Sequence, residues 1–139
     1  MPLVRITTRA GTPLADQRVI ADGVQDALVS AIGVPAHDRF QILDERPAES
    51  LIFDAEYLGV DRRDVVSVEI KLVRGRSADQ KKALYQAIAD NLEKAGVRRE
   101  DVFVVLTETG REDWSFGNGE AQLLDVELLK RHGWTPPAS

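Results

Sequence analysis

The sequence has no cysteine and only two histidines among its 139 residues. Without cysteine the chain can form no disulfide bond and has no thiolate for nucleophilic or redox chemistry. The two histidines, His37 and His132, are too few for a convincing zinc site, and we interpret both as surface residues. No nucleotide-binding motif is present either, so we expect a protein that uses no cofactor.

A concentration of positive charge and a long hydrophobic run are also missing. The 18 Lys and Arg residues are scattered and outnumbered by 23 Asp and Glu residues, which gives a formal net charge of -5. Proteins that bind nucleic acids concentrate Lys and Arg, so we expect no nucleic-acid partner. No apolar run is long enough to cross a membrane, and Arg5 and Arg9 interrupt the first one before it could form a signal peptide. We therefore expect a cytoplasmic protein without a membrane partner.

Hydrophobic side chains make up 43% of the residues, which is enough for the core of a single domain over residues 1–139. Within this domain one unit occurs twice. Shifting the sequence by about 63 residues aligns Gly33 with Gly96, and it also aligns Asp38 with Asp101. The two halves cover about residues 2–45 and 65–108, and residues 110–139 form a C-terminal tail.

Each half reads as strand, helix, strand. The strands are expected at residues 3–8, 40–43, 65–73 and 102–106, and the first strand of each half, 3–8 and 65–73, is rich in β-branched residues. The first helix has Pro13 in its first turn and ends at Gly33. The second begins at a capping box opened by Ser77 and ends at Gly96. Residues 46–63 connect the halves, and the tail contains a tight turn at 117–119, a short helix at 123–129 and a frayed end at 135–139.

This pattern predicts an α+β fold. Each half is a β-α-β unit with parallel strands, and two such units can share one four-stranded mixed sheet with both helices on one face. Apolar residues at alternate strand positions would leave the other face uncovered in a monomer. We therefore expect an oligomer that buries this second face.

Pro2 is the first candidate for chemistry. A small residue at this position normally permits removal of the initiator Met1, which would leave a free secondary amine at the head of an apolar strand. An α-amine has a pKa of about 7.7 to 8.0, so its neighbours decide whether it acts as an acid or as a base near neutral pH. The alternative is that proline merely begins an edge strand.

Arg74 and Arg76 flank Gly75 where the third strand leads into the second helix. Residues two apart in an extended segment point to one face, so the two guanidinium groups can converge. Beside a helix N-terminus they would clamp a carboxylate. A solvated strand end is the alternative interpretation.

Asp38 and two aromatic residues complete the candidates. Asp38 lies just before the second strand, where a carboxylate could hold an amine protonated or activate a water. It could equally cap a turn, as its repeat partner Asp101 suggests. Trp114 and Phe116 place two aromatic rings on one face ahead of a turn, as a pocket wall or as core or interface packing.

A combination of these features resembles the tautomerase superfamily, and within it the malonate semialdehyde decarboxylase branch. The features are the proline in an apolar strand, the duplicated unit, the stretches DRFQ and DWSFG, and the arginine step before the second helix. The resemblance covers about residues 2–129 and implies a homotrimer with a catalytic amino-terminal proline. In decarboxylases of that branch the proline works with an aspartate and two arginines, which match Pro2, Asp38, Arg74 and Arg76 here.

The resemblance also places Trp114 and Phe116 near the active-site wall. One departure is Gly75, because a proline stands between the arginines in the decarboxylase. The arginine clamp of this chain is therefore expected to be looser.

The implied activity is decarboxylation of a small 3-oxo acid such as malonate semialdehyde to an aldehyde and CO2, with hydration of an unsaturated acid as a side activity. Protonated Pro2, kept charged by Asp38, would stabilise the enolate, or would form a Schiff base. The arginines lower the pKa of the amine, and if they outweigh Asp38 the chain is instead a keto-enol tautomerase of 2-keto acids such as phenylpyruvate. A non-catalytic trimeric binding protein is the third reading.

Overall fold

The computed structural model of the protein describes residues 1–134, and the predicted frayed end at 135–139 lies outside them. Its single sheet has the strand order β2-β1-β3-β4. The strands are β1 (Leu3–Arg9), β2 (Gln41–Arg46), β3 (Val66–Val73) and β4 (Val102–Thr109). β1 runs parallel to β2 and antiparallel to β3, and β3 runs parallel to β4. The predicted mixed sheet is therefore confirmed.

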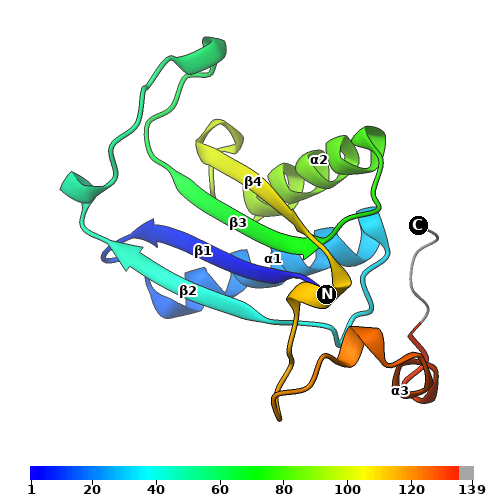
Figure 1. Ribbon diagram of the computed structural model, residues 1–139. Coiled ribbons are helices and arrows are strands. Elements are labelled where there is room, and N and C mark those ends of the chain that lie inside the picture. The colour runs from blue at the N-terminus through cyan, green and yellow to red at the C-terminus, as the bar shows by residue number, and fades with distance from the viewer. Residues whose placement is uncertain (135–139) are drawn as a thin grey trace.

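Two long helices, α1 (Leu14–Ile32) and α2 (Ala78–Lys94), cover one face of this sheet (Figure 1). Ser77 forms the predicted capping box with Gln80, and Gly33 ends α1 at a φ of 74°. Pro13 occupies the N-cap position of α1 and not its first turn.

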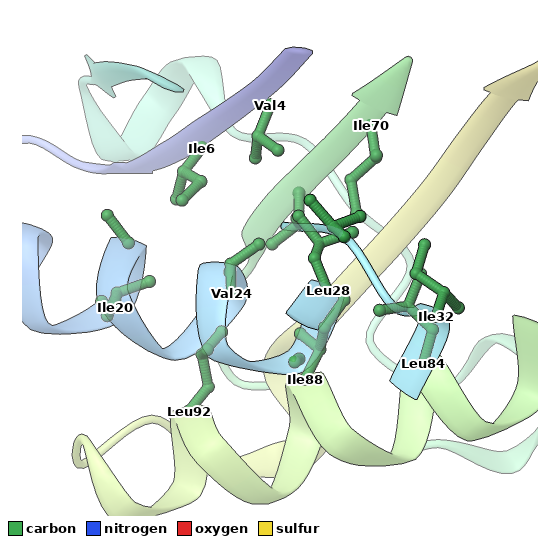
Figure 2. Packing of buried hydrophobic residues seen from close by; sticks show 14 of the residues in the cluster. Val4, Ile6, Ile20, Val24, Leu28, Ile32, Ile70, Leu84, Ile88 and Leu92 are labelled. Atoms are coloured by element: carbon green, nitrogen blue, oxygen red, sulfur yellow. The ribbon is translucent and has the colours of Figure 1, made fainter. Parts of the chain in front are cut away.

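The main core lies between the sheet and these helices. Figure 2 shows apolar side chains of α1 and α2 meeting Val4, Ile6 and Ile70 from the sheet. The side chains that recur along the two helices are Ile20, Val24, Leu28, Leu84, Ile88 and Leu92. Gly23 allows the helices to pack closely, because a Cβ atom there would lie 3.3 Å from the Cβ atom of Asn91.

The strands and the tail differ in length from the prediction. β2 and β4 each extend three residues further than expected, to Arg46 and Thr109. The short helix predicted in the tail is present, but its bounds of 123–129 are wrong, because a 3-10 turn (Gln122–Leu124) and the short helix α3 (Val126–Arg131) flank Asp125. Asp125 begins α3 by accepting a hydrogen bond from the backbone of Leu128, so it separates the two turns.

The second face of the sheet is mixed in character, which corrects the expectation of an apolar face. The central strands expose Arg5, Glu69 and Lys71, whereas exposed apolar residues lie on the two outer strands, at Ile42 of β2 and at Phe103 and Val105 of β4. The linker arm, residues 47–64, extends away from the sheet (Figure 1). Among the residues described, no helix is both long and apolar enough to span a membrane, and a cytoplasmic location stays a prediction.

Candidate active site

Several predicted site residues lie at one end of the sheet, where β1 and β2 begin and β3 ends, and the strand register explains why. Val4 of β1 pairs with Gln41 of β2. Met1 and Asp38 each precede this pair by three residues, so they lie side by side just before the two strands begin. The Met1 amino group lies 2.7 Å from the Oδ2 atom of Asp38. Because β1 is antiparallel to β3, the exit of β3 reaches the same end (Figure 1).

Pro2, the residue after Met1, is fully buried. While Met1 is attached, the Pro2 nitrogen is a tertiary amide without basicity. Standard bond lengths place that nitrogen within about 3.7 Å of the Met1 nitrogen, hence at most about 6.4 Å from Asp38 Oδ2. Removal of Met1 would therefore create an amine in the neighbourhood of the same carboxylate.

Asp38 is held by the backbone around it. Its N–H donates to the carbonyl of Pro35 at 2.9 Å, and the buried side chain of Gln25 donates from Nε2 to its carbonyl oxygen at 3.1 Å. The side chain is only 7% exposed, and its Oδ1 atom is buried without a partner among the described residues. Such an oxygen can accept a further hydrogen bond from a water or a ligand.

The repeat partner Asp101 shows what the same position does where no chain end is near. Its Oδ1 atom accepts hydrogen bonds from the backbone N–H groups of Arg63 and Asp64 and from the guanidinium of Arg98. In both halves the aspartate thus bonds nitrogens of the segment that leads into the neighbouring strand. In the first half this nitrogen belongs to the chain's free amino group.

Arg76 is the arginine that lies close to the amine. It is partly buried and lines a cavity of about 270 Å³ together with Met1, Val73 and Trp134. Burial lowers the pKa of the Arg76 guanidinium, and the charge of Asp38 opposes this. At the Met1 amine, burial lowers the pKa, the hydrogen bond and charge of Asp38 raise it, and the charge of Arg76 lowers it, with a net lowering.

Arg74 lies elsewhere. It is exposed and lines a different cavity with Gly110 and Glu112. Gly75 between the two arginines has a φ of 137°, a conformation suited to glycine, and the chain turns there. Within one chain the structure does not bring the two guanidinium groups into one cavity.

Trp114 and Phe116 are stacked, with ring centroids 5.7 Å apart, and Phe116 stacks in turn on Phe40 at 6.1 Å. The Trp114 indole donates to the hydroxyl of Thr109 at 2.7 Å, which anchors the ring to the end of β4. Phe40 and Phe116 line a cavity of about 370 Å³ that also contains Met1 and Asp38.

The sequence patterns did not reveal the rest of this cavity's wall. Leu123, Leu129 and Trp134 come from the tail, and Gln122 fastens the tail to Phe116 through a 2.9 Å hydrogen bond from the backbone N–H. A short irregular segment has no periodicity from which this role could be read. His37 and His132 are exposed, and among residues 1–134 no group of three or more His, Cys, Asp or Glu side chains could hold a metal.

Two family models, each described as tautomerase enzyme, match residues 38–117 and residues 2–61. A curated relative, the probable tautomerase YusQ of Bacillus subtilis (strain 168), is 36% identical over 127 residues, which covers 90% of this chain and 100% of YusQ.

Solved structures share the fold. FG41 malonate semialdehyde decarboxylase inhibited by 3-bromopropiolate matches with a TM-score of 0.85 and 38% identity, over 90% of this chain and 96% of that chain. A symmetric trimer of wild-type fused 4-OT matches with a TM-score of 0.71 and 27% identity, over 85% and 94%.

In this chain two β-α-β units share one sheet, and the N-terminal amine lies near the carboxylate of Asp38 and the guanidinium of Arg76. The chain belongs to the tautomerase superfamily, a family of enzymes, and within it to the branch that resembles malonate semialdehyde decarboxylase.

Proposed function

We propose that the chain, once Met1 is removed, decarboxylates a 3-oxo acid of the malonate semialdehyde type, with the Pro2 amine as the catalytic group. The observation that carries this proposal is the 2.7 Å ion pair between the Met1 amine and Asp38, with Arg76 beside it, because the Pro2 amine would lie near the same two groups once Met1 is removed. A carboxylate beside an amine favours the ammonium form, which is the form this reaction requires. The 38% identity to a malonate semialdehyde decarboxylase supports the same reaction.

In this reaction the bond between the α-carbon and the carboxylate breaks. Its electron pair forms an enolate, and CO2 leaves. The Pro2 ammonium donates a hydrogen bond to the carbonyl oxygen, where negative charge develops, and Asp38 keeps the amine charged. Arg76 binds the carboxylate and turns it out of the carbonyl plane. Protonation of the enolate carbon then gives the aldehyde or ketone.

Arg74 is proposed as a second ligand of the carboxylate. This role requires the segment after β3 to turn about Gly75, because Arg74 faces another cavity in the structure. Trp114 and Phe116 are proposed as the aromatic wall that keeps water from the amine. Hydration of an unsaturated acid is a proposed side activity, in which the unpartnered Oδ1 atom of Asp38 accepts a proton from water.

A second candidate is a keto-enol tautomerase of 2-keto acids, and one observation favours it. Burial outweighs Asp38 at the Met1 amine and lowers its pKa, and the same environment at Pro2 would favour a base. Such a base would move a proton between the α-carbon and the oxygen of phenylpyruvate, and Arg76 would bind the carboxylate. A non-catalytic binding protein remains the third candidate.

We also propose that the chain forms a homotrimer. The similar fused 4-OT structure is a symmetric trimer, and the linker arm carries exposed apolar side chains that a neighbouring subunit would cover.

The deciding experiment measures acetaldehyde release from malonate semialdehyde beside the ketonisation of phenylpyruvate. The protein is first shown by intact mass spectrometry to lack Met1, and Pro2→Ala serves as the matched variant. Fast aldehyde release that the substitution stops supports the decarboxylase. Turnover of phenylpyruvate alone identifies a tautomerase. Retention of Met1 in the native protein contradicts both.

A further inference from the structure

The cavity beside the terminal amine is largely apolar. It measures about 370 Å³, within the roughly 300–1,000 Å³ of small-molecule sites. Phe116, Leu123, Leu128, Leu129 and Trp134 form its apolar wall. Leu123 and Leu129 are buried, and His37 and His132 are exposed. A three-carbon oxo acid would leave most of this wall without a partner.

Met1 already occupies part of this region. Its side chain is 17% exposed and packs against the cluster of Val73, Leu123 and Leu129, while its amino group binds Asp38. Met1 also lines the neighbouring cavity that contains Arg76. Removal of Met1 would therefore enlarge both cavities and leave space for an unbranched apolar chain of about four non-hydrogen atoms, the size of a methionine side chain.

The wall is fixed by its own hydrogen bonds. Gln122 accepts from the backbone N–H of Phe116 at 2.9 Å and donates to the carbonyl of Gly117 at 2.8 Å. The N–H of Trp134 donates to the carbonyl of Leu129 at 2.9 Å. The apolar wall thus has hydrogen bonds of its own in which Met1 takes no part.

We propose that the substrate of this site is an oxo acid with an unbranched apolar tail of at least about four non-hydrogen atoms, in the space that the Met1 side chain now fills. That the substrate is an oxo acid rests on the proposed function. That it carries an apolar tail rests on the cavity. The carboxylate lies at Arg76, the carbonyl at the Pro2 amine, and the tail against Leu123, Leu129 and Trp134.

The first test measures binding, with saturated straight-chain carboxylates from acetate to heptanoate titrated into Met1-free protein. The affinity should rise about three- to fourfold for each added methylene group until the cavity is filled. An affinity that stays flat or falls with chain length overturns the inference.

Two matched comparisons locate the tail. Trp134→Ala should lower the affinity for hexanoate roughly tenfold and leave that for acetate unchanged. Val126→Ala, at an exposed position of the same segment, should alter neither. Protein that retains Met1, made with methionine aminopeptidase inhibited, should bind hexanoate no better than acetate. Hexanoate binding of equal strength with Met1 present overturns the inference.

Turnover separates this inference from the proposed function. Straight-chain 3-oxo acids should be decarboxylated with a higher kcat/KM than malonate semialdehyde. If the affinity for carboxylates does not change with chain length while malonate semialdehyde is decarboxylated, the inferred apolar tail is wrong and the proposed decarboxylase activity is supported. If affinity rises with chain length but no oxo acid turns over, the apolar-tail site stands and the decarboxylase is wrong.

Discussion

The aspartates Asp38 and Asp101 show why only one of the two repeated units would carry the proposed catalytic site. Asp38 and Asp101 occupy equivalent turns, and both accept hydrogen bonds from the segment that enters the adjacent strand. At Asp101 the donors are two backbone amides, which cannot titrate, and the guanidinium of Arg98. At Asp38 the donor is the terminal amine, which titrates near neutral pH in its ordinary state. The chain end therefore gives Asp38 its proposed role.

Asp38→Asn is the sharpest test at this scale. It removes the charge that favours the ammonium form, so decarboxylation should fall about 100-fold or more, a typical loss for an acid-base partner. Ketonisation of phenylpyruvate, which needs the free base, should retain a sizeable part of its rate. The two activities are measured on one preparation, with Asp26→Asn at an exposed site of α1 as the control. Equal loss of both activities would contradict the assigned role.

The pH dependence of kcat/KM for decarboxylation tests the same electrostatic role of Asp38 independently. Decarboxylation is lost as the pH rises through the amine pKa, because the ammonium disappears. At the Met1 amine Asp38 raises the pKa and Arg76 lowers it, and we expect the same two effects at the Pro2 amine. The alkaline limb should therefore move to lower pH in Asp38→Asn and to higher pH in Arg76→Gln. Limbs that move in the same direction in both variants would exclude this electrostatic arrangement.

At the residue scale the sequence indicated Asp38, Arg76 and Phe116 because they lie in short recognisable stretches. It did not indicate Leu123, Leu129 or Trp134, since their role depends on the path of an irregular tail. It also suggested that Arg74 and Arg76 converge, which assumed an extended segment. The positive φ of Gly75 turns the chain instead.

At the scale of elements, the repeat and the caps were sufficient to predict four strands and two long helices in their correct order. Strand ends were underestimated for a physical reason. The last residues of β2 and β4, such as Asp44, Arg46 and Glu108, are polar and lie near the surface, where alternation of apolar residues fades. The pairing of β1 with both β2 and β3, which gathers the site at one end of the sheet, depends on register and not on local propensity.

Gly75→Ala tests whether the backbone conformation just after β3 determines the position of the Arg76 side chain. A side chain at a φ of 137° is strained, so the variant should lose about 1–2 kcal/mol of unfolding free energy. Its KM for the oxo acid should also rise, since Arg76 is the next residue. Gly11→Ala, at a φ of 98° in a loop with open space around it, should lose similar stability with unchanged KM. Urea unfolding and steady-state kinetics measure both, and equal KM values for the two variants would remove Gly75 from this role.

At the scale of the whole molecule, the linker arm and the outer strand β4 expose apolar side chains that nothing in the described part of the single subunit covers. Ile52 is 93% exposed and Leu58 84%, far more than isolated surface apolar residues require. The arm is ordered by its own backbone bonds, such as Ser50 N–H to Pro47 and Arg62 N–H to Ala55. An ordered arm that carries apolar side chains and extends away from its own sheet can pack against a neighbouring subunit. Sequence periodicity could not show this, because the arm has no regular secondary structure through which its apolar face would repeat.

Ile52→Asp should therefore weaken the proposed trimer without unfolding the subunit. Burying an isoleucine contributes about 1.5–3 kcal/mol, and a buried unpaired aspartate adds a further cost, repeated at every copy of the interface. We expect the protein concentration for half-dissociation to rise at least roughly 100-fold, measured by analytical ultracentrifugation. Glu49→Gln, at an exposed site of the same arm, is the matched control and should leave assembly unchanged. Circular dichroism checks that the variant subunit stays folded, since the arm contributes no residue to the main core. A folded Ile52→Asp protein that assembles as tightly as the parent would show that the arm does not form the interface.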